Sequence, residues 1–86
     1  MFIHLGENVV ITDKKIIGIF DMDTSTVNKA TRDYLSNAEK TGRVEYINYE
    51  LPKSFIVTVK NGVEKVYISQ LSAATLRKRL KEGGGF

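Results

Sequence analysis

The sequence predicts a small α+β domain, built from one mainly antiparallel sheet and two helices. Three observations support this fold class: a length of 86 residues, short apolar runs separated by turn residues, and two segments with helical spacing. A chain of this length suits one domain, because a second would have too little surface to bury. We expect the order β-β-β-α-β-β-β-α, with residues 1–82 as a single domain and residues 83–86 as a flexible tail.

The N-terminal part of the chain contains three predicted strands. Phe2 to Leu5 and Asn8 to Ile11 are short apolar runs separated by a Gly-Glu dipeptide, a pattern typical of a hairpin with a tight turn. After a second turn, Lys15 to Phe20 (KIIGIF) is almost continuously apolar, which is typical of a strand buried on both faces. The glycine inside this run predicts a bulge or a close approach by another backbone segment.

The next segment changes to helical spacing. Thr24 and Ser25 are candidate N-caps, and Gly42 is a candidate C-terminal stop. Between them, apolar or small side chains recur at helical intervals, at Val27, Thr31, Tyr34, Leu35 and Ala38. We therefore expect one amphipathic helix from Ser25 to Thr41.

The second half of the chain predicts three strands and a final helix. Arg43 to Tyr49 alternates in the manner of a strand. Ser54 to Lys60 and Val63 to Ser69 flank an Asn-Gly dipeptide, which is the strongest short-range signal for a two-residue hairpin. Ser72 is a candidate N-cap for the last helix, which we expect to run through Glu82.

The composition narrows the possible functions. The chain is 42% hydrophobic and 27% charged, as expected for a folded module. It has no cysteine, which excludes a disulfide framework, a thiolate nucleophile and a zinc ribbon. No signal-peptide pattern and no apolar run of ~20 residues is present, so we expect a cytoplasmic protein that does not engage a membrane.

The usual catalytic residue patterns are missing from the sequence. His4 is the only histidine, and sharing a strand face with Phe2 favours a hydrogen-bonded strand residue over a functional imidazole. Asp21 and Asp23 could bind a divalent cation, but they are more typical of a strand end that leads into a helix. No glycine-rich loop follows a strand to hold nucleotide phosphates. We expect no enzyme, no cofactor, no metal and no small-molecule substrate.

The basic residues are the remaining sequence feature that could indicate a binding partner. The 13 Lys and Arg outnumber the 10 Asp and Glu, for a net charge of +3, which permits an acidic partner without requiring one. Lys14 and Lys15 precede one predicted strand, Lys53 precedes another, and four cations crowd the segment from Arg77 to Lys81. Such residues often form only a solvated surface, and cations near a helix C-terminus are favourable in themselves. The few aromatic residues are mostly patterned inward, which argues against single-strand nucleic-acid binding.

Several strings, read together, resemble a known family. They are FIHLGENVVI, IIGIFD, PKSFIVTV and VYISQLSAATLRKRL. They resemble the extracellular matrix regulatory proteins of Gram-positive bacteria, the RemA/RemB group, and they are more similar to the RemB branch, where the histidine-leucine-glycine start, GIFD and PKS recur. The resemblance covers residues 2 to 80. It implies a cytoplasmic regulator of biofilm matrix genes, with a fold similar to LytTR-type DNA-binding domains and ring-like homo-oligomers that present basic surfaces to double-stranded DNA.

The resemblance also implies where DNA is contacted. The RemA branch carries an arginine cluster directly before the strand that here begins at Ser54, and a basic residue matching Lys15 also belongs to its pattern. In this chain the cluster is replaced by LPKS, which leaves Lys53 as one cation, after a proline that ends the preceding strand. The expected DNA-binding residues are Lys53, Lys15, Lys14 and Ser54.

Two hypotheses about function remain open. The first is an oligomeric, DNA-binding transcriptional regulator whose weak lysine contacts add up across subunits. The second is an oligomeric structural or protein-interaction module that does not contact DNA directly. Both include self-association, because the apolar strands offer more surface than two short helices can cover in so small a domain.

Overall fold

The computed structural model of the protein describes residues 2–25, 28–47 and 51–82. The strands are β1 (Phe2–Gly6), β2 (Val9–Thr12), β3 (Ile16–Asp21), β4 (Val44–Tyr46), β5 (Ser54–Lys60) and β6 (Val63–Ser69). The helices are the 3-10 turn η1 (Asp13–Lys15), the single turn α1 (Met22–Ser25), α2 (Lys29–Lys40) and α3 (Ala73–Lys81). The predicted α+β class is confirmed. The predicted tail at residues 83–86 lies outside the described part of the chain.

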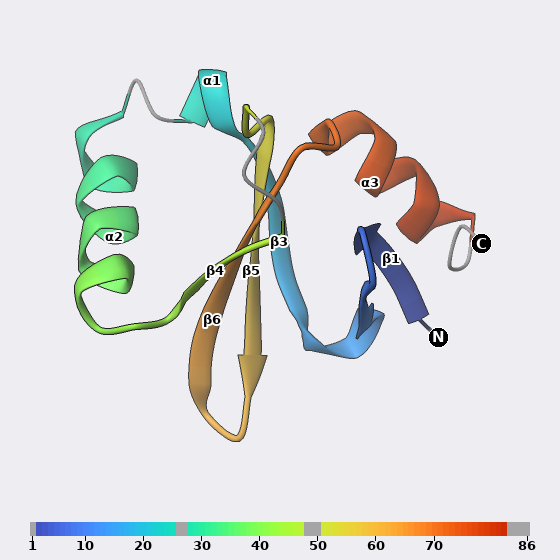
Figure 1. Cartoon of the computed structure of the whole chain (residues 1–86), viewed down its shortest axis with the longest axis horizontal. Helices are drawn as coiled ribbons and strands as arrows, with labels where there is room; N and C mark the ends of the chain where they lie inside the picture. The colour runs from blue at the N-terminus through green and yellow to red at the C-terminus, as the bar shows by residue number, and fades with distance from the viewer. Residues whose placement is uncertain (1, 26–27, 48–50, 83–86) are drawn as a thin grey trace.

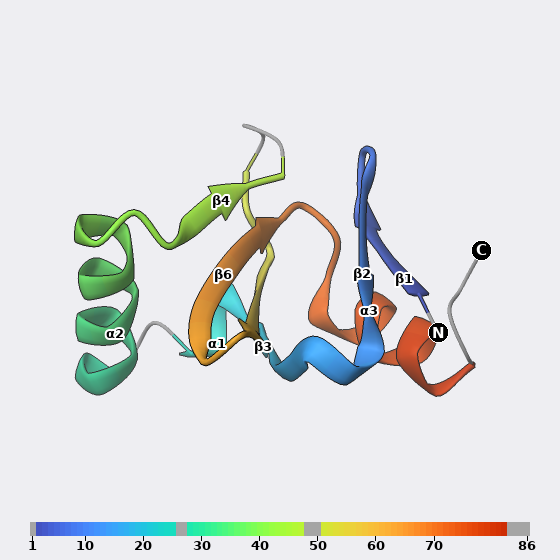
Figure 2. The ribbon, with the colours of Figure 1, turned by 90° about the horizontal axis from the view of Figure 1, so that it is seen from below.

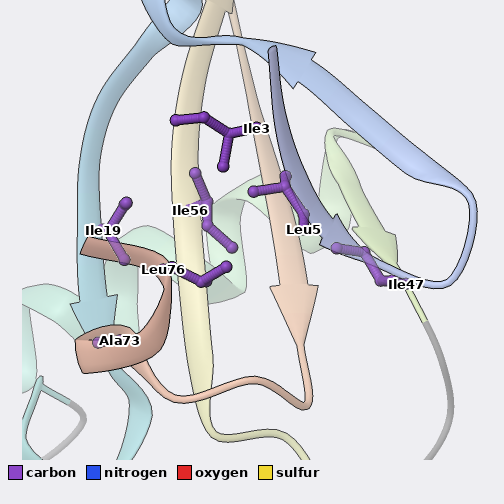
Figure 3. Packing of buried hydrophobic residues seen from close by; sticks show 7 residues of the cluster. All are labelled: Ile3, Leu5, Ile19, Ile47, Ile56, Ala73 and Leu76. Carbon is purple, nitrogen blue, oxygen red and sulfur yellow. The ribbon is translucent and has the colours of Figure 1, made fainter. Parts of the chain in front are cut away.

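The elements form layers around a four-stranded sheet with the order β3-β5-β6-β4. Helix α2 lies against one face of this sheet, whereas the β1–β2 hairpin and α3 lie against the other (Figures 1 and 2). One core therefore forms on each face. The core under α2 contains Ala38, Phe55, Val57, Val66 and Ile68. The core under the hairpin and α3 contains Ile3, Leu5, Ile19, Ile47, Ile56, Ala73 and Leu76 (Figure 3).

Strand β5 joins the two cores. Its side chains alternate between the faces, so Phe55 and Val57 enter one core while Ile56 enters the other. This explains why residues 54–59 are apolar with few interruptions, since a strand covered on both faces needs apolar side chains at every position.

The pairing of the strands is mostly antiparallel, as predicted. β5 pairs antiparallel with β3 and β6, while β4 pairs parallel with β6. The β5–β6 turn has positive φ angles of 53° at Asn61 and 78° at Gly62, which confirms the predicted Asn-Gly hairpin. The prediction of a single sheet was wrong, because β1 and β2 pair only with each other.

The first hairpin turns one residue later than predicted. β1 continues through Gly6, which pairs with Val9, so the turn falls on Glu7 and Asn8 rather than on Gly6 and Glu7. A register irregularity between His4 and Gly6, together with a φ of 129° at Gly6, accounts for the displacement.

The predicted irregularity in β3 is present at Gly18. The register with β5 shifts between Ile16 and Gly18, which confirms a bulge. The close neighbour is a side chain rather than another backbone: a β-carbon at Gly18 would lie 2.7 Å from atoms of the Phe20 ring. Glycine is therefore required at this position for the ring to lie over the strand.

The helical segment from Ser25 to Thr41 is not one helix, which corrects the sequence-based prediction. The N-cap of α2 is Asn28, whose side-chain oxygen accepts a hydrogen bond from the Ala30 backbone N–H at 2.8 Å. Its extended backbone (φ −84°, ψ 127°) is incompatible with a helix that runs through it, so Thr24 and Ser25 do not cap α2. The end of the helix agrees with the prediction, with Gly42 at φ 71°.

The last strands and helix follow the sequence closely, with small differences at their ends. β4 is shorter than the predicted strand, and residues 48–50 of that prediction lie outside the described chain. The side chain of Ser72 caps α3 by accepting the Thr75 N–H at 3.1 Å. Of the apolar face of α3, Leu76 is buried and Leu80 is partly exposed.

Strand β3 departs from the prediction that it is buried on both faces. Ile17 is 57% exposed and Phe20 is 39% exposed. β3 is an edge strand, and α2 packs beside it over β5 and β6, so this part of the face stays uncovered in a single chain. Among the described residues, no helix has the length and hydropathy required to cross a membrane.

Candidate nucleic-acid interface

Lys53 is held by its backbone directly before β5. Its N–H donates to the Ser69 carbonyl, and its carbonyl accepts from the Met22 N–H, both at 2.9 Å. The preceding residue, Pro52, has no backbone N–H, so it leaves no hydrogen-bond donor unpaired where the chain enters the sheet. The Lys53 side chain is exposed and makes no ion pair with any residue that the structure describes. Its backbone is fixed while its ammonium group is available to a ligand.

Lys53 borders a shallow hollow of about 310 Å³, shared with Leu51, Gln70 and Leu71. The hollow is open to solvent, and its polar groups come from the ends of the sheet. A phosphate group could approach the Lys53 ammonium here without displacing an existing ion pair.

Ser54 has a structural role instead. Its side chain is 0% exposed, and its Oγ donates a hydrogen bond to the Leu71 carbonyl at 2.7 Å. This hydrogen bond fixes the chain between β6 and α3 against the start of β5. The expectation that Ser54 contacts DNA is not supported by this placement, because a buried hydroxyl does not reach a phosphate.

Lys14 and Lys15 lie in η1, at the other end of the sheet from Lys53. Ile16 pairs with Thr58, whereas Asp21 pairs with Ser54. At about 3.3 Å per residue, the stretch from Ser54 to Thr58 separates the two ends by ~13 Å. One subunit therefore presents two of the expected DNA-binding lysines, Lys15 and Lys53, at opposite ends of β3 and β5.

Lys15 belongs to a second basic surface that the sequence analysis did not find, which we call the basic hollow. It has a volume of about 340 Å³, and the residues that line it are Phe2, Val10, Lys15, Lys60, Lys65 and Tyr67, together with Ile11, Thr12 and Thr58. The hairpin register could have revealed part of it, because an Asn-Gly turn places Lys60 opposite Val63 and Thr58 opposite Lys65. The neighbouring position of Lys15 depends on the β3–β5 pairing, for which the sequence has no local signal.

Within the basic hollow, the three lysines differ in their partners. The Lys65 ammonium lies 2.8 Å from Glu45 Oε1 and 5.0 Å from the centroid of the Tyr67 ring. The hydrogen bond to Glu45 raises the pKa of Lys65, so this side chain stays protonated. Lys15 and Lys60 make no ion pair with a described residue.

A third surface feature is the apolar groove between α2 and β3. It has a volume of about 350 Å³ and is lined mainly by Ile17, Phe20, Tyr34, Phe55, Val57 and Glu64. The rings of Phe20 and Phe55 stack with their centroids 5.1 Å apart. At the polar end, the Tyr34 hydroxyl donates to Glu64 Oε1 at 2.6 Å.

The Tyr34–Glu64 pair keeps a single negative charge at this end of the groove. Burial, followed by the hydrogen bond to Glu64 and the Glu64 charge, raises the pKa of Tyr34 to about 12. Tyr34 is thus neutral at physiological pH and donates its hydroxyl proton to the Glu64 carboxyl group.

The comparisons with known proteins agree with the sequence resemblance. The family described as RemA-like, extracellular matrix regulatory protein A-like, matches residues 2–80. The chain is also 38% identical over 79 residues to extracellular matrix regulatory protein B of Bacillus subtilis (strain 168), covering 92% of this chain and 89% of that protein. The chain belongs to the RemA-like family. The recognition made from the sequence strings is confirmed.

In this RemA-like protein, the arginines of α3 are engaged in holding the fold together. Arg77 Nη2 donates to the Ile19 carbonyl at 2.7 Å, and Arg79 Nη1 donates to the His4 carbonyl at 2.9 Å. The arginines therefore tie α3 to β3 and β1. The cations of this helix that remain for a ligand are Lys78 and Lys81, and Lys78 lies 3.9 Å from Glu82.

The residues considered for metal or proton chemistry have ordinary structural positions in this RemA-like chain. The His4 ring nitrogen Nε2 is hydrogen-bonded to the Glu7 carbonyl, as expected for a strand residue beside a turn. Asp21 ends β3 and Asp23 lies in α1. Over residues 2–25, 28–47 and 51–82, no three His, Cys, Asp or Glu side chains come together as a possible metal site.

Proposed function

We propose that this RemA-like protein is a non-enzymatic, oligomeric DNA-binding regulator of transcription that acts in the cytoplasm on biofilm matrix genes. Family membership supports a regulatory role in matrix production. The placement of Lys53 is the main support for DNA contact. Its side chain is an exposed cation without an ion pair among the described residues, and its backbone is hydrogen-bonded on both sides. Such a side chain suits a phosphate contact, which fixes position and contributes affinity without reading bases.

Self-association is the second part of the proposal. Ile17 and Phe20 leave an apolar strip exposed beside the apolar groove, on a domain too small to bury it. We propose a second copy of the chain as its cover. The groove lies on the α2 face of the sheet, whereas the hollow at Lys53 includes Leu71, which packs against the core on the other face. Contacts through the α2 face would therefore leave Lys53 accessible.

An oligomer would convert weak contacts into useful affinity. Because each subunit presents Lys53 and Lys15 at opposite ends of the sheet, one subunit offers few phosphate contacts to a duplex. A symmetric assembly repeats each lysine with regular spacing. Once one subunit has bound the DNA, the lysines of the other subunits are held at a high effective concentration near the phosphates, which strengthens the overall binding. A lysine supplies no base code, so any sequence preference would arise from DNA shape or bending.

Fluorescence anisotropy with a labelled duplex, at about 50 mM and about 200 mM salt, tests this function. We expect saturable binding that weakens steeply with salt, because each phosphate contact contributes about 0.9 to the slope of log K against log salt. Lys53→Glu should weaken binding about tenfold or more, since the reversed charge repeats in every subunit. Lys15→Glu should act in the same direction, with a smaller effect because Lys15 is half-buried.

The matched control is Lys40→Glu, which makes the same charge change on an exposed lysine at the end of α2. We expect it to leave DNA affinity nearly unchanged. Equal losses for Lys40→Glu and Lys53→Glu would mean that only net charge matters. Binding that does not depend on salt would remove the phosphate mechanism altogether.

The apolar groove also favours a second candidate function, a protein-interaction module that does not bind DNA. The groove combines the stacked Phe20 and Phe55 rings with a carboxylate at Glu64, a combination that suits a protein segment with apolar and basic side chains. An oligomer that forms without the groove, so that Ile17→Asp leaves its mass unchanged, and that shows no saturable DNA binding would favour this second function over the first.

A further inference from the structure

The basic hollow lies between two hairpins that are far apart in the sequence. The β1–β2 hairpin contributes Phe2 and Val10, while the β5–β6 hairpin contributes Lys60, Lys65 and Tyr67. Lys15, from the 3-10 turn that joins β2 to β3, completes the lining. Because rigid strands supply both walls, the hollow is part of the fold rather than a property of one loop.

The charge of the hollow is strongly positive. Three lysines line it, and one carboxylate, Glu45, pairs with the Lys65 ammonium group at 2.8 Å. Lys15 and Lys60 have no ion pair with a described residue, so their charges are not compensated by the part of the chain that the structure describes. Two such ammonium groups at one concavity suit a ligand with more than one negative charge, such as a diphosphate.

The hollow also presents apolar side chains beside its lysines. Phe2 is 57% exposed and Val10 is 44% exposed, although both lie on strands. Tyr67 adds a second aromatic ring, which the Lys65 ammonium approaches to 5.0 Å. An exposed aromatic ring beside lysines suits a ligand that has a flat ring as well as an anionic group.

Duplex DNA does not match this combination. The convex phosphate backbone of a duplex would meet the lysines, but it would leave the Phe2 and Val10 side chains without an apolar partner. A mononucleotide could satisfy both features, with its phosphates at Lys15 and Lys60 and its base against Phe2. The volume of about 340 Å³ lies near the lower end of the ~300–1,000 Å³ typical of small-ligand sites, which favours one nucleotide over two.

We propose that the basic hollow is a binding site for a nucleoside diphosphate or a ligand of the same chemistry, an anionic phosphate chain joined to a flat aromatic ring. The ligand is bound and released unchanged, so no reaction is implied. The site is distinct from Lys53, which lies at the opposite end of the sheet. A nucleotide there would cover Lys15 and so could adjust the DNA contact proposed above.

Isothermal titration calorimetry of the full chain tests this site, with ADP and GDP as probes that differ only in their base. Adenosine and pyrophosphate separate the two halves of the ligand. We expect saturable binding of a nucleoside diphosphate, with adenosine and pyrophosphate each about tenfold weaker or more, because each retains only one kind of contact. The proposal is overturned if neither ADP nor GDP binds, or if pyrophosphate binds as tightly as they do.

Two variants and a control locate the site. Lys60→Gln and Phe2→Ser should each weaken nucleotide binding about fivefold or more, since they remove one charge and one aromatic surface. Lys53→Gln removes the same charge as Lys60→Gln at the other end of the sheet, and it should leave nucleotide binding unchanged. Equal losses for these two lysine variants, or no loss for Lys60→Gln, would refute the assignment. Circular dichroism confirms that each variant is folded.

The same variants separate this site from the proposed DNA contact. Lys60→Gln should weaken nucleotide binding and keep most of its DNA affinity in the anisotropy assay, whereas Lys53→Glu should show the reverse pattern. A protein that binds no DNA but retains nucleotide binding would overturn the proposed function and leave the nucleotide site standing.

Discussion

Replacing Gly62 by valine tests the turn that brings the two long strands together. Asn61 and Gly62 have φ angles of 53° and 78°, as a type I′ turn requires. A residue with a β-carbon is strained in this region, and a β-branched one more so. A β-carbon at Gly62 meets no atom within 4 Å, so the β-carbon itself adds no steric clash with the rest of the chain. The expected loss of stability therefore comes from backbone strain.

The size of the effect follows from this geometry. Strain at a left-handed position costs roughly 1–2 kcal/mol per residue with a β-carbon. For a domain of this length, about 1 kcal/mol lowers the melting temperature by roughly 4–8 °C. We therefore expect Gly62→Val to melt roughly 4–16 °C below the parent protein in a circular-dichroism melt.

A matched substitution isolates the cause. Gly62→Asn also adds a β-carbon and a polar group, but asparagine adopts left-handed φ more easily. It should therefore lose clearly less stability than Gly62→Val. If the two variants melt together, side-chain size rather than φ is the cause. If neither melts below the parent protein, the positive φ at Gly62 does not describe the turn in solution.

Three further predictions follow from the same structure. Ile17→Asp should lower the mass of the assembly in sedimentation equilibrium and leave the subunit folded, because it places a charge on the exposed strip of β3; an unchanged mass would put the interface elsewhere. Ser54→Ala should cost roughly 1–3 kcal/mol in urea unfolding, because the partly buried Leu71 carbonyl loses its donor; weaker DNA binding at full stability would instead return Ser54 to the DNA site. For Tyr34, whose pKa in the folded protein is about 12 and so exceeds the usual 10.0 of a tyrosine, the stabilising contribution is present below pH 10 and is lost as the pH rises to 12. Tyr34→Phe should flatten this loss in unfolding free energies measured across that range.

Local signals in the sequence predicted the elements that depend on a few adjacent residues. The Asn-Gly dipeptide determines the β5–β6 hairpin because its backbone requirement is met within the turn itself. Ser72 determines the start of α3 for the same reason, since its hydroxyl accepts the Thr75 N–H three residues later. The family resemblance predicted a regulatory function, which no single residue could have indicated.

Predictions that needed long-range information failed or stayed incomplete. Thr24, Ser25 and Asn28 are all good N-caps, and local propensity cannot say which one the tertiary structure selects. The placement of Lys15 and Lys53 at opposite ends of one strand pair required the β3–β5 register, which is set by core packing. The basic hollow was missed for the same reason, because its two walls come from hairpins at opposite ends of the chain.

For strand β3, the burial that the sequence predicts differs from the burial that a single chain provides. The run KIIGIF has the composition of a strand covered on both faces, yet a single chain leaves Ile17 and Phe20 exposed. An added strand at the β3 edge is disfavoured, because Arg77 already donates to the Ile19 carbonyl at 2.7 Å. The face beside α2 is therefore the part of β3 that a second copy would cover. In that arrangement the apolar pattern of β3 matches its burial in the assembly, and this is why we assign self-association to the apolar groove rather than to the strand edge.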